Sequence, residues 1–451
     1  MKLSNTTDLN LRHFFVQVSL TFVRQAFSVV CQLVFVILLA RVLGPEGNGQ
    51  YTVAVSLSML VVNLLSFGVP AANVFFIGKG SVSARTVFMA NLKIWGVLIL
   101  IGALVSTVLV GGFSTNLFKG IPPRLLWLSL AFFPLTLMYT LLASILQGRQ
   151  DFTRYNATLI LPAVVSLAAA VVFVYLMGLG VTGGLLSWGL GQCAGLVSAL
   201  VSVRPHIRDE IGREVKNVSY IRHCLNYGWK AHASNVISFL NYRLDLFLVN
   251  LFVGPTGSGI YSVAIQITER LWLLSQAVST VLLPRLSELH TDETARMQLT
   301  PLVARWVTYI GFFCAVLLAI FVRPLVHLLF GPSYEKVAVA LFFLLPGVVT
   351  FSCARVLAND IAARGRPEIN IWTAGIALTV SLVCNILLIP RYGINGASLA
   401  VTIAFSLSTI VTMSFYSHLS GNNWLRPIMI EDIDRRLFSK LMAHSGLMRR
   451  L

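Results

Sequence analysis

Residues 44–55 read GPEGNGQYTVAV, and residues 254–265 read GPTGSGIYSVAI. Seven of the twelve positions are identical at an offset of 210 residues. The identities include a proline, a tyrosine and a Val-Ala pair, so glycine content alone does not explain them. Each copy stands between two long apolar stretches. The repeat therefore predicts two similar halves, with the motif between the first and second helix of each half.

Two shorter echoes keep the same order in the two halves. The pair Gly148-Arg149 recurs as Gly365-Arg366, and GVTGG at residues 180–184 recurs as GINGA at residues 393–397. From these landmarks we predict a six-helix bundle at residues 1–203, a basic linker at 204–222, a second six-helix bundle at 223–418 and a basic tail at 419–451.

The composition indicates that much of the chain faces lipid. Hydrophobic residues make up 56% of it and charged residues only 11%, whereas about a quarter of a soluble domain is charged. A helix that crosses a bilayer needs about 20 apolar residues. We therefore predict an all-α integral membrane protein with about twelve transmembrane helices, at residues 14–43, 50–77, 86–111, 124–147, 156–178, 181–203, 226–253, 260–285, 302–330, 337–362, 369–390 and 394–418.

The distribution of basic residues predicts the orientation. An even number of spans places both termini on one side, and that side holds most of the Lys and Arg residues. The opposite side holds few: Arg41, Lys119, Arg124, Arg323, Lys336 and Arg391. The positive-inside rule therefore predicts cytoplasmic termini, and it explains the net charge of +17 without nucleic acid. Two halves of six helices share their orientation, so we expect a pseudo-twofold axis along the membrane normal and a central cavity.

The tail beyond about residue 420 is polar and basic. Ile430, Ile433, Leu437 and Leu441 follow one another at helical spacing, which is typical of a short helix on the inner membrane surface. A frayed cytoplasmic tail is an equally acceptable interpretation.

Polar side chains in the first span form a candidate anion site. Charges inside lipid cost about 2.5–3.5 kcal/mol each on insertion scales, so we expect them to face the protein interior. Arg24, Gln25 and Gln32 share one helical face. A central arginine among hydrogen-bonding partners suits an anionic group in a hydrated cavity. The alternative is a structural Arg24 that pairs with a carboxylate or a helix C-terminus.

The seventh and eighth spans contribute further cations. Lys230, Arg243 and Arg270 are candidates for binding the same anionic group. Arg243 and Asp245 are two residues apart in a helix, so they cannot face each other directly and each needs another partner. We interpret Asp245 as a structural counter-ion for Arg243 or Lys230.

Glu269 and Asp245 are the acidic residues at central depth in the predicted spans. They are therefore the candidates for coupling transport to protons or other cations. The structural alternative for Glu269 is an ion pair with Arg270 or Arg24.

No motif predicts catalysis. The six cysteines are scattered, mostly in apolar runs, without metal-ligand or disulfide spacing. The sequence has no nucleophile elbow, P-loop, HExxH motif or paired catalytic carboxylates. We expect no enzyme activity, no cofactor, no metal and no catalytic residue.

Residues 40–51, ARVLGPEGNGQY, resemble the signature of bacterial polysaccharide transporters, the Wzx-type O-antigen flippases. The stretch FGVPA at residues 67–71 and the two Gly-Arg pairs fit the same pattern. The resemblance extends through nearly the whole chain. It also implies membership of the superfamily of multidrug, oligosaccharidyl-lipid and polysaccharide exporters, which is MATE-like.

The resemblance implies a function. The family moves an undecaprenyl-diphosphate-linked oligosaccharide, such as an O-antigen or exopolysaccharide repeat unit, across the bacterial inner membrane by alternating access. It implies as partners the polyprenyl-diphosphate-linked glycan, the lipid bilayer, and the polysaccharide polymerase and chain-length proteins.

Three alternatives stay open. They are a cation-coupled multidrug antiporter, a lipid II-type flippase, which typically has two more helices, and a membrane scaffold that transports nothing. The excess of basic over acidic residues at central depth disfavours the first.

Overall fold

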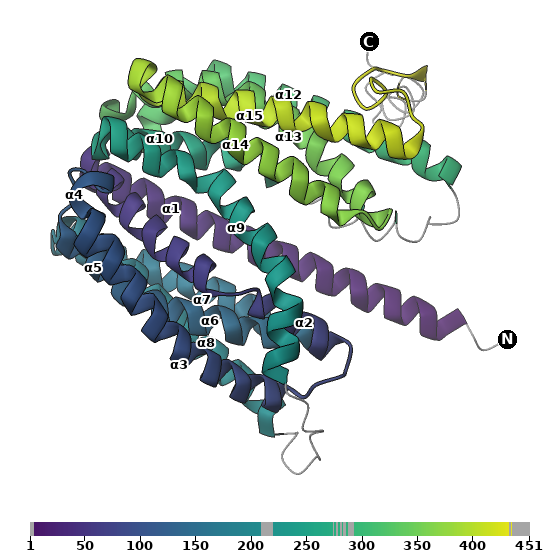
Figure 1. Cartoon of the computed structure of the whole chain (residues 1–451), viewed down its shortest axis with the longest axis horizontal. Coiled ribbons are helices and arrows are strands. Elements are labelled where there is room, and N and C mark those ends of the chain that lie inside the picture. The colour runs from purple at the N-terminus through teal and green to yellow at the C-terminus, as the bar shows by residue number, and fades with distance from the viewer. Residues whose placement is uncertain are drawn as a thin grey trace. The chain divides into compact units, whose positions relative to one another are not determined.

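The computed structural model describes residues 4–208, 220–273, 275–276, 278–279, 282, 286, 293–432 and 434, with side chains from Phe27 onward except Lys230 and Ala231. Every regular element in these residues is a helix, which confirms the all-α class. The chain, which Figure 1 colours from the N-terminus to the C-terminus, divides into two compact units. Unit 1 comprises residues 1–239 and 254–259, and unit 2 comprises residues 240–253 and 260–451.

Unit 1 contains the helices up to the first part of α9. They are α1 (Ser4–Leu65), α2 (Val69–Gly78), α3 (Ala84–Thr107), a π-helical turn (Val108–Gly112), α4 (Phe113–Leu117), α5 (Pro123–Ala131), α6 (Phe133–Gly148), α7 (Phe152–Ala170), a second π-helical turn (Val171–Leu176), α8 (Gly180–Arg208) and α9 (Tyr220–Val253). Helix α8 packs against both α6 and α7, and α7 also packs against α1. Fully buried leucines such as Leu137 and Leu141 in α6 and Leu185 in α8 belong to this core.

Both copies of the repeated motif begin at a break in a helix. In α1, Gly44 has φ 66° and ψ −179°, between two helical stretches. Gly254 has φ 92°, between α9 and Pro255, the first residue of α10. Glycine adopts a positive φ without steric cost, and a proline fits the first turn of a helix because its missing N–H would be unpaired there. The structure thus confirms the two predicted helix junctions.

The two motif copies contact each other within unit 1. A Cβ on Gly49 would lie 1.8 Å from the carbonyl oxygen of Pro255, and a Cβ on Gly259 would lie 1.8 Å from that of Pro45. Asn48 Nδ2 also donates a hydrogen bond of 3.3 Å to the carbonyl oxygen of Gly259. Because the glycine contacts join equivalent positions reciprocally, the two copies meet across a local twofold axis.

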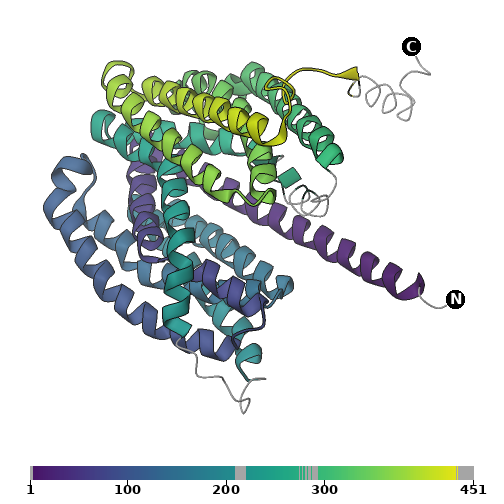
Figure 2. The same cartoon turned by 45° about the vertical axis from the view of Figure 1, so that its right-hand side comes forward.

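Unit 2 contains the rest of α9, α10 from Ile260 onward and the helices after it. They are α10 (Pro255–Glu269), α12 (Glu293–Phe330), a 3₁₀ turn (Pro332–Tyr334), α13 (Lys336–Ala363), α14 (Pro367–Tyr392) and α15 (Ile394–Ser420). Helix α13 packs against α12 and α15, and α14 packs against α15. Figures 1 and 2 show α13, α14 and α15 side by side. Buried Leu357, Ile361 and Met413 belong to the core of this unit.

Ten helical stretches in the described residues are long and apolar enough to cross a membrane. They are 27–65, 84–117, 123–148, 152–176, 180–208, 232–253, 293–330, 336–363, 367–392 and 394–420. The chain is therefore a polytopic membrane protein. The predicted spans 14–43 and 50–77 are joined in α1, and the second continues as the ten-residue α2 after a break at Phe67 and Gly68. The predicted span 260–285 matches α10 as far as Glu269 and then enters a stretch that the structure describes only in part.

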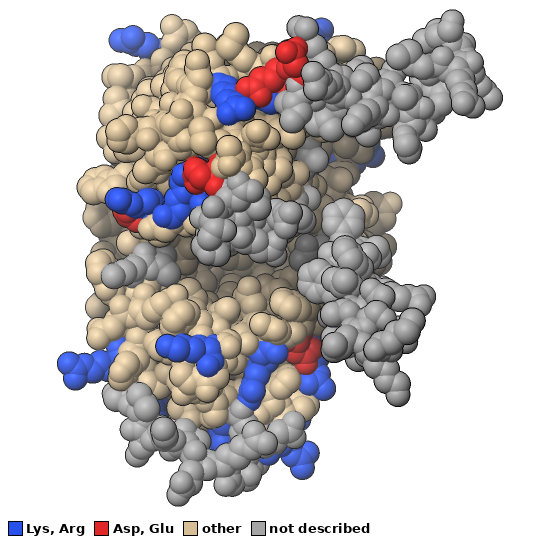
Figure 3. All heavy atoms as spheres, turned by 90° about the vertical axis from the view of Figure 1, so that its right-hand side faces the viewer, with Lys and Arg blue, Asp and Glu red and all other residues tan. Residues whose placement is uncertain are grey.

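The surface agrees with a lipid environment. Large apolar side chains such as Leu100, Leu328 and Trp372 are exposed on the helices. In the face displayed by Figure 3, charged side chains stand in small groups on a mostly uncharged surface. A surface of this kind is stable in a bilayer, where apolar side chains need no cover from water.

Candidate functional site

An ion pair in unit 2 joins α9, which contains a membrane-spanning stretch, to α10. Arg243 Nη1 donates a hydrogen bond of 2.9 Å to Glu269 Oε1, and Nη2 lies 3.5 Å from Oε2. Two parallel N–H···O contacts form the fork geometry in which arginine binds carboxylates and phosphates best. The side chains remain 33% and 26% exposed, so the pair is held in place but is reachable by a ligand.

Among the described side chains, Glu269 pairs with Arg243 and not with the expected Arg270, whereas a pair with Arg24 stays a prediction because that side chain lies outside the described residues. Neighbouring residues on a helix point about 100° apart, so Glu269 and Arg270 diverge. The chain reverses at the break at Gly254, and this brings Arg243, before the break, against Glu269, after it.

Asp245 has hydrogen-bond partners of its own. Its Oδ2 accepts a hydrogen bond of 2.6 Å from Tyr261 Oη, and its Oδ1 accepts one of 2.8 Å from the backbone N–H of Leu246. The carboxylate is buried. Within the described residues it is therefore held by a hydroxyl and an amide, while Arg243 forms its direct ion pair with Glu269. The role of Asp245 as a counter-ion of Arg243 or Lys230 stays a prediction.

The charged residues Arg243, Asp245 and Glu269 of this pair of helices have apolar counterparts in the first repeat. At the offset of 210 residues, Asp245 corresponds to Phe35 and Tyr261 to Tyr51. The rings of Phe35 and Tyr51 contact each other at 6.0 Å between centroids, in the place where the second repeat has a hydrogen bond.

The ion pair between Arg243 and Glu269 also has apolar residues at the equivalent positions of the first repeat. By the same offset, Arg243 and Glu269 correspond to Leu33 and Met59. The two repeats thus share a backbone motif but differ in chemistry.

A second cation of unit 2 lies over an aromatic ring. The guanidinium carbon of Arg355, in α13, is 5.3 Å from the centre of the Trp272 ring. Trp272 donates its indole N–H to the carbonyl oxygen of Val348, and its ring also contacts Phe351 and Phe405. No carboxylate in the described part of unit 2 pairs with Arg355, so a ring face supports its charge.

Arg270 adds a third cation. Its Nε is buried and has no hydrogen-bond partner among the residues that the structure describes. A buried donor without a partner is costly, about 1–3 kcal/mol, and is a reason to look for a ligand.

The candidates of the first span are described only in part. Gln32 Nε2 donates a hydrogen bond of 3.3 Å to Ser28 Oγ, and Ser28 Oγ donates one of 3.3 Å to the carbonyl oxygen of Leu159 in α7. Gln32 therefore takes part in a link between α1 and α7. The side chains of Arg24, Gln25 and Lys230 lie outside the described residues, and their proposed roles stay predictions.

Arg355 is the residue that sequence reasoning undervalued. It stands near the predicted cytoplasmic end of the tenth span, where the positive-inside rule accounts for any basic residue. The distinguishing signal is a tryptophan on another helix, and sequence spacing cannot reveal that contact.

Comparison with known proteins links the chain to polysaccharide synthesis. A family model described as polysaccharide biosynthesis protein matches residues 38–339. The chain is 29% identical over 190 residues to the capsular polysaccharide biosynthesis protein CapF of Staphylococcus aureus, an alignment that covers 41% of this chain and 48% of CapF. It is 22% identical over 257 residues to Agl15 of Haloferax volcanii, named as a low-salt glycan biosynthesis flippase, with 55% of this chain and 49% of Agl15 covered. The chain thus spans about half the length of these two relatives.

A third relative aligns over most of its length. It is a Shigella flexneri protein named as an O-antigen transporter, 22% identical over 404 residues, with 84% of this chain and 92% of the relative covered.

Solved structures share the fold. The chain is similar to the lipid II flippase MurJ in its inward closed conformation, with a TM-score of 0.74 and 15% identity over 96% of this chain and 99% of that one. It is also similar to an inward-facing multidrug resistance MATE family transporter of the MOP superfamily, with a TM-score of 0.70 and 13% identity over 89% and 98% of the two chains. At these identities the likeness concerns the fold alone.

Proposed function

Because the chain belongs to the polysaccharide biosynthesis protein family, we propose that it is a flippase that moves an undecaprenyl-diphosphate-linked oligosaccharide across the bacterial cytoplasmic membrane. The cargo is an O-antigen or exopolysaccharide repeat unit. Relatives named as a glycan flippase and as an O-antigen transporter support this assignment. The observation that carries it is Arg243, a partly exposed arginine inside a membrane-spanning helix that forms an ion pair with one carboxylate, Glu269, among the described residues.

The chemistry of the cargo explains why an arginine is needed. A diphosphate carries about two negative charges, and a charge of this kind does not enter hydrocarbon unaided. Arginine stays protonated when it is desolvated, and its fork binds phosphate oxygens as it binds a carboxylate. Arg243 therefore exchanges Glu269 for the diphosphate when the cargo enters, and Arg270 and Arg355 add positive charge to the same unit.

The exchange provides a means of coupling. Once Arg243 turns to the diphosphate, Glu269 loses its counter-ion in a site of low polarity, and its carboxylate favours uptake of a proton or a cation. When the cargo leaves, the Arg243–Glu269 pair forms again and the proton or cation departs. Glu269 is thus the coupling residue, and Asp245 supports the site through Tyr261.

The transport cycle follows the proposed architecture. Two parallel six-helix halves, joined by the linker at residues 204–222, alternate access to the two leaflets, with both termini in the cytoplasm. The reciprocal contact of the two motif copies supports a twofold relation between the repeats. The polysaccharide polymerase and chain-length proteins receive the product, and the protein itself catalyses no covalent step.

The test is genetic and chemical. Deletion of the gene is expected to remove surface polysaccharide and to leave the lipid-linked oligosaccharide in the cytoplasmic leaflet. Complementation with Arg243→Ala or Arg24→Ala is expected to restore membrane protein but not polysaccharide. Arg323→Ala, an exposed arginine of α12, is the matched control and is expected to restore both. Normal surface polymer with both Arg24→Ala and Arg243→Ala contradicts the proposal.

The structural neighbours define the competing functions. The likeness to a MATE transporter fits a multidrug antiporter, which predicts drug sensitivity after deletion. The likeness to MurJ fits a lipid II flippase, which predicts arrested cell-wall synthesis. A scaffold that transports nothing predicts that all intramembrane arginines are dispensable.

A further inference from the structure

The chain beyond α15 is tied back onto α12. We define the strap as residues 421–434, of which all but residue 433 are described. Arg305 of α12 is fully buried beneath it. The guanidinium donates a hydrogen bond of 2.6 Å to the carbonyl oxygen of Arg426 and forms ion pairs with Glu431 at 3.3 Å and Asp434 at 2.8 Å. The buried side chain of Arg305 thus holds the strap at Arg426 and again at Glu431 and Asp434.

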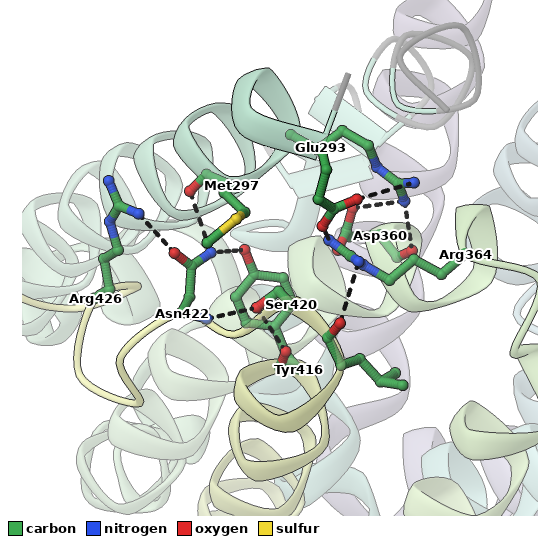
Figure 4. Close-up of polar contacts among 10 residues, drawn as sticks. Glu293, Met297, Asp360, Arg364, Tyr416, Ser420, Asn422 and Arg426 are labelled. Atoms are coloured by element: carbon green, nitrogen blue, oxygen red, sulfur yellow. Dashed lines mark hydrogen bonds and ion pairs between the residues drawn. The ribbon is translucent and has the colours of Figure 1, made fainter. Parts of the chain in front are cut away.

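A second set of contacts fixes the start of the strap. Asn422 donates hydrogen bonds to the carbonyl oxygen of Met297 at 3.2 Å and to Tyr416 Oη at 2.9 Å, and it accepts one from Arg426 at 2.6 Å (Figure 4). Tyr309 Oη donates to the carbonyl oxygen of Ile428. The strap is therefore attached to α12 at several points along its length.

The outward side of the strap is apolar. Trp424, Leu425 and Ile428 are each about two-fifths exposed, and Met429 and Ile430 are 59% and 61% exposed. The polar side chains of the strap and of Arg305 pair with one another. Arg305 and Arg426 pair with Glu431 and Asp434, and Arg305, Asp434 and Asn422 are buried. Glu431 and Arg426 are about a third exposed, and Asn423 and Asp432 are the exposed polar residues in the described part of the strap.

Helix α15 is long enough for the strap to begin at the depth of the lipid head groups. Helix α15 has 27 residues, which at 1.5 Å per residue span about 40 Å. This length matches the whole bilayer with its polar regions, and it exceeds the roughly 30 Å of hydrocarbon. A segment that leaves α15 at Ser420 therefore starts at the boundary between lipid and water, where tryptophan is favoured.

We propose that the strap is an interfacial anchor, whose apolar side lies in the boundary between head groups and acyl chains of the leaflet where α15 ends. Inward ion pairs remove the cost of bringing Glu431 and Asp434 close to lipid. The residues that follow in the sequence complement an anionic leaflet, because they include Arg435, Arg436, Lys440, Arg449 and Arg450. Arg305 is a positioning residue, which turns the apolar side of the strap toward the bilayer.

The test measures the depth of the strap directly. A nitroxide label is placed on Met429→Cys or Ile430→Cys in a variant without the native cysteines, in vesicles of phosphatidylethanolamine and phosphatidylglycerol. Collisions with oxygen, which concentrates in lipid, are compared with collisions with a water-soluble nickel chelate. Leu328→Cys is the lipid reference and Glu368→Cys the aqueous reference, since both positions are exposed.

The expected oxygen-to-nickel ratio at positions 429 and 430 is several-fold above that at position 368. Nickel-dominated collisions overturn the anchor, because the strap then lies in water. Few collisions with either reagent also overturn it, because the apolar side then docks on protein.

A second variant tests whether Arg305 positions the strap, separately from whether the strap lies in lipid. Arg305→Gln is expected to lower the ratio at position 430 several-fold, whereas Arg323→Gln on the same helix is expected to leave it unchanged. An unchanged ratio with Arg305→Gln rejects the positioning role of Arg305. If Arg305→Gln does not fold, the labels in the native background still decide whether the strap lies in lipid.

Discussion

Gly49 and Gly259 pack against each other's motif, and each leaves no room for a β-carbon beside the carbonyl oxygen of the opposite proline. Small residues allow two helices to approach backbone to backbone, as they do in many membrane helix pairs. The crossing joins segments that are 210 residues apart in sequence. It is therefore a long-range contact on which the placement of two helices depends.

Alanine at Gly49 or Gly259 is expected to destabilise the protein. The added Cβ would lie 1.8 Å from a carbonyl oxygen, so the helices must separate. Overpacking of this kind costs about 1–3 kcal/mol. The apparent melting temperature in detergent should fall for each variant. Gly96→Ala and Gly375→Ala are the controls, because no neighbouring atom lies within 4 Å of either added Cβ. Equal melting temperatures for the four variants would contradict the crossing.

Exchanging the charges of Arg243 and Glu269 should separate stability from transport. Arg243→Gln leaves the Glu269 carboxylate without its partner, at a cost of about 1–3 kcal/mol. The double variant Arg243→Glu with Glu269→Arg restores an ion pair, so its melting temperature should return to that of the native protein. Surface polysaccharide should stay low, because the arginine that we propose binds phosphate is then on α10 instead of α9. Full recovery of polysaccharide in the exchanged variant would show that the pair is only structural.

Tyr261→Phe is expected to destabilise the protein more than Tyr51→Phe does. Tyr261 donates a 2.6 Å hydrogen bond to the buried Asp245, and its loss leaves a carboxylate oxygen without a donor, at about 1–3 kcal/mol. Tyr51, at the equivalent position, contacts the ring of Phe35 and has no hydrogen bond to its hydroxyl within the described residues. Thermal unfolding of the two variants measures the difference. A larger loss of stability with Tyr51→Phe would contradict the inferred asymmetry of the two repeats.

Asp360→Asn should be among the most destabilising single changes in unit 2. Asp360 is fully buried at the end of α13 and binds Arg296 at 3.0 Å and Arg364 at 2.7 Å, with Glu293 against Arg364 (Figure 4). Breaking a buried ion pair costs about 3–5 kcal/mol, because the remaining charges stay buried.

Glu368→Gln is the matched control for Asp360→Asn. Its pair with Arg366 is 3.9 Å long, and both side chains are more than half exposed. We expect no measurable change in its unfolding temperature. Similar losses in the two carboxylate variants would argue against a special role of the buried network.

The sequence predicted the helix breaks because glycine and proline determine them locally. Gly44-Pro45 and Gly254-Pro255 each require a positive φ followed by the start of a helix, and neighbouring residues suffice to show it. The number of membrane spans was harder to predict. Hydropathy does not reveal the break at Phe67, a non-glycine residue with φ 44°, so the prediction joined α2 to the span before it.

The partners of the charged residues could not be predicted from spacing. Helical periodicity tells which side of a helix a residue lies on, but not which helix faces it. Glu269 binds Arg243 because the chain reverses at Gly254, and Arg305 finds its partners more than 120 residues later, in the strap. Such contacts depend on tertiary packing, which a single sequence does not encode in any local pattern.

The unequal chemistry of the two repeats limits how the chain can be rearranged. A tandem fusion of two first repeats would keep both Gly-Pro breaks and the glycines of the crossing. It would replace Arg243, Asp245 and Glu269 by Leu33, Phe35 and Met59, and so lose every ionised group of that site. The two repeats thus share the Gly-Pro motif but not these charged residues, so an engineered chimera that keeps them must take the helices of this pair from the second repeat.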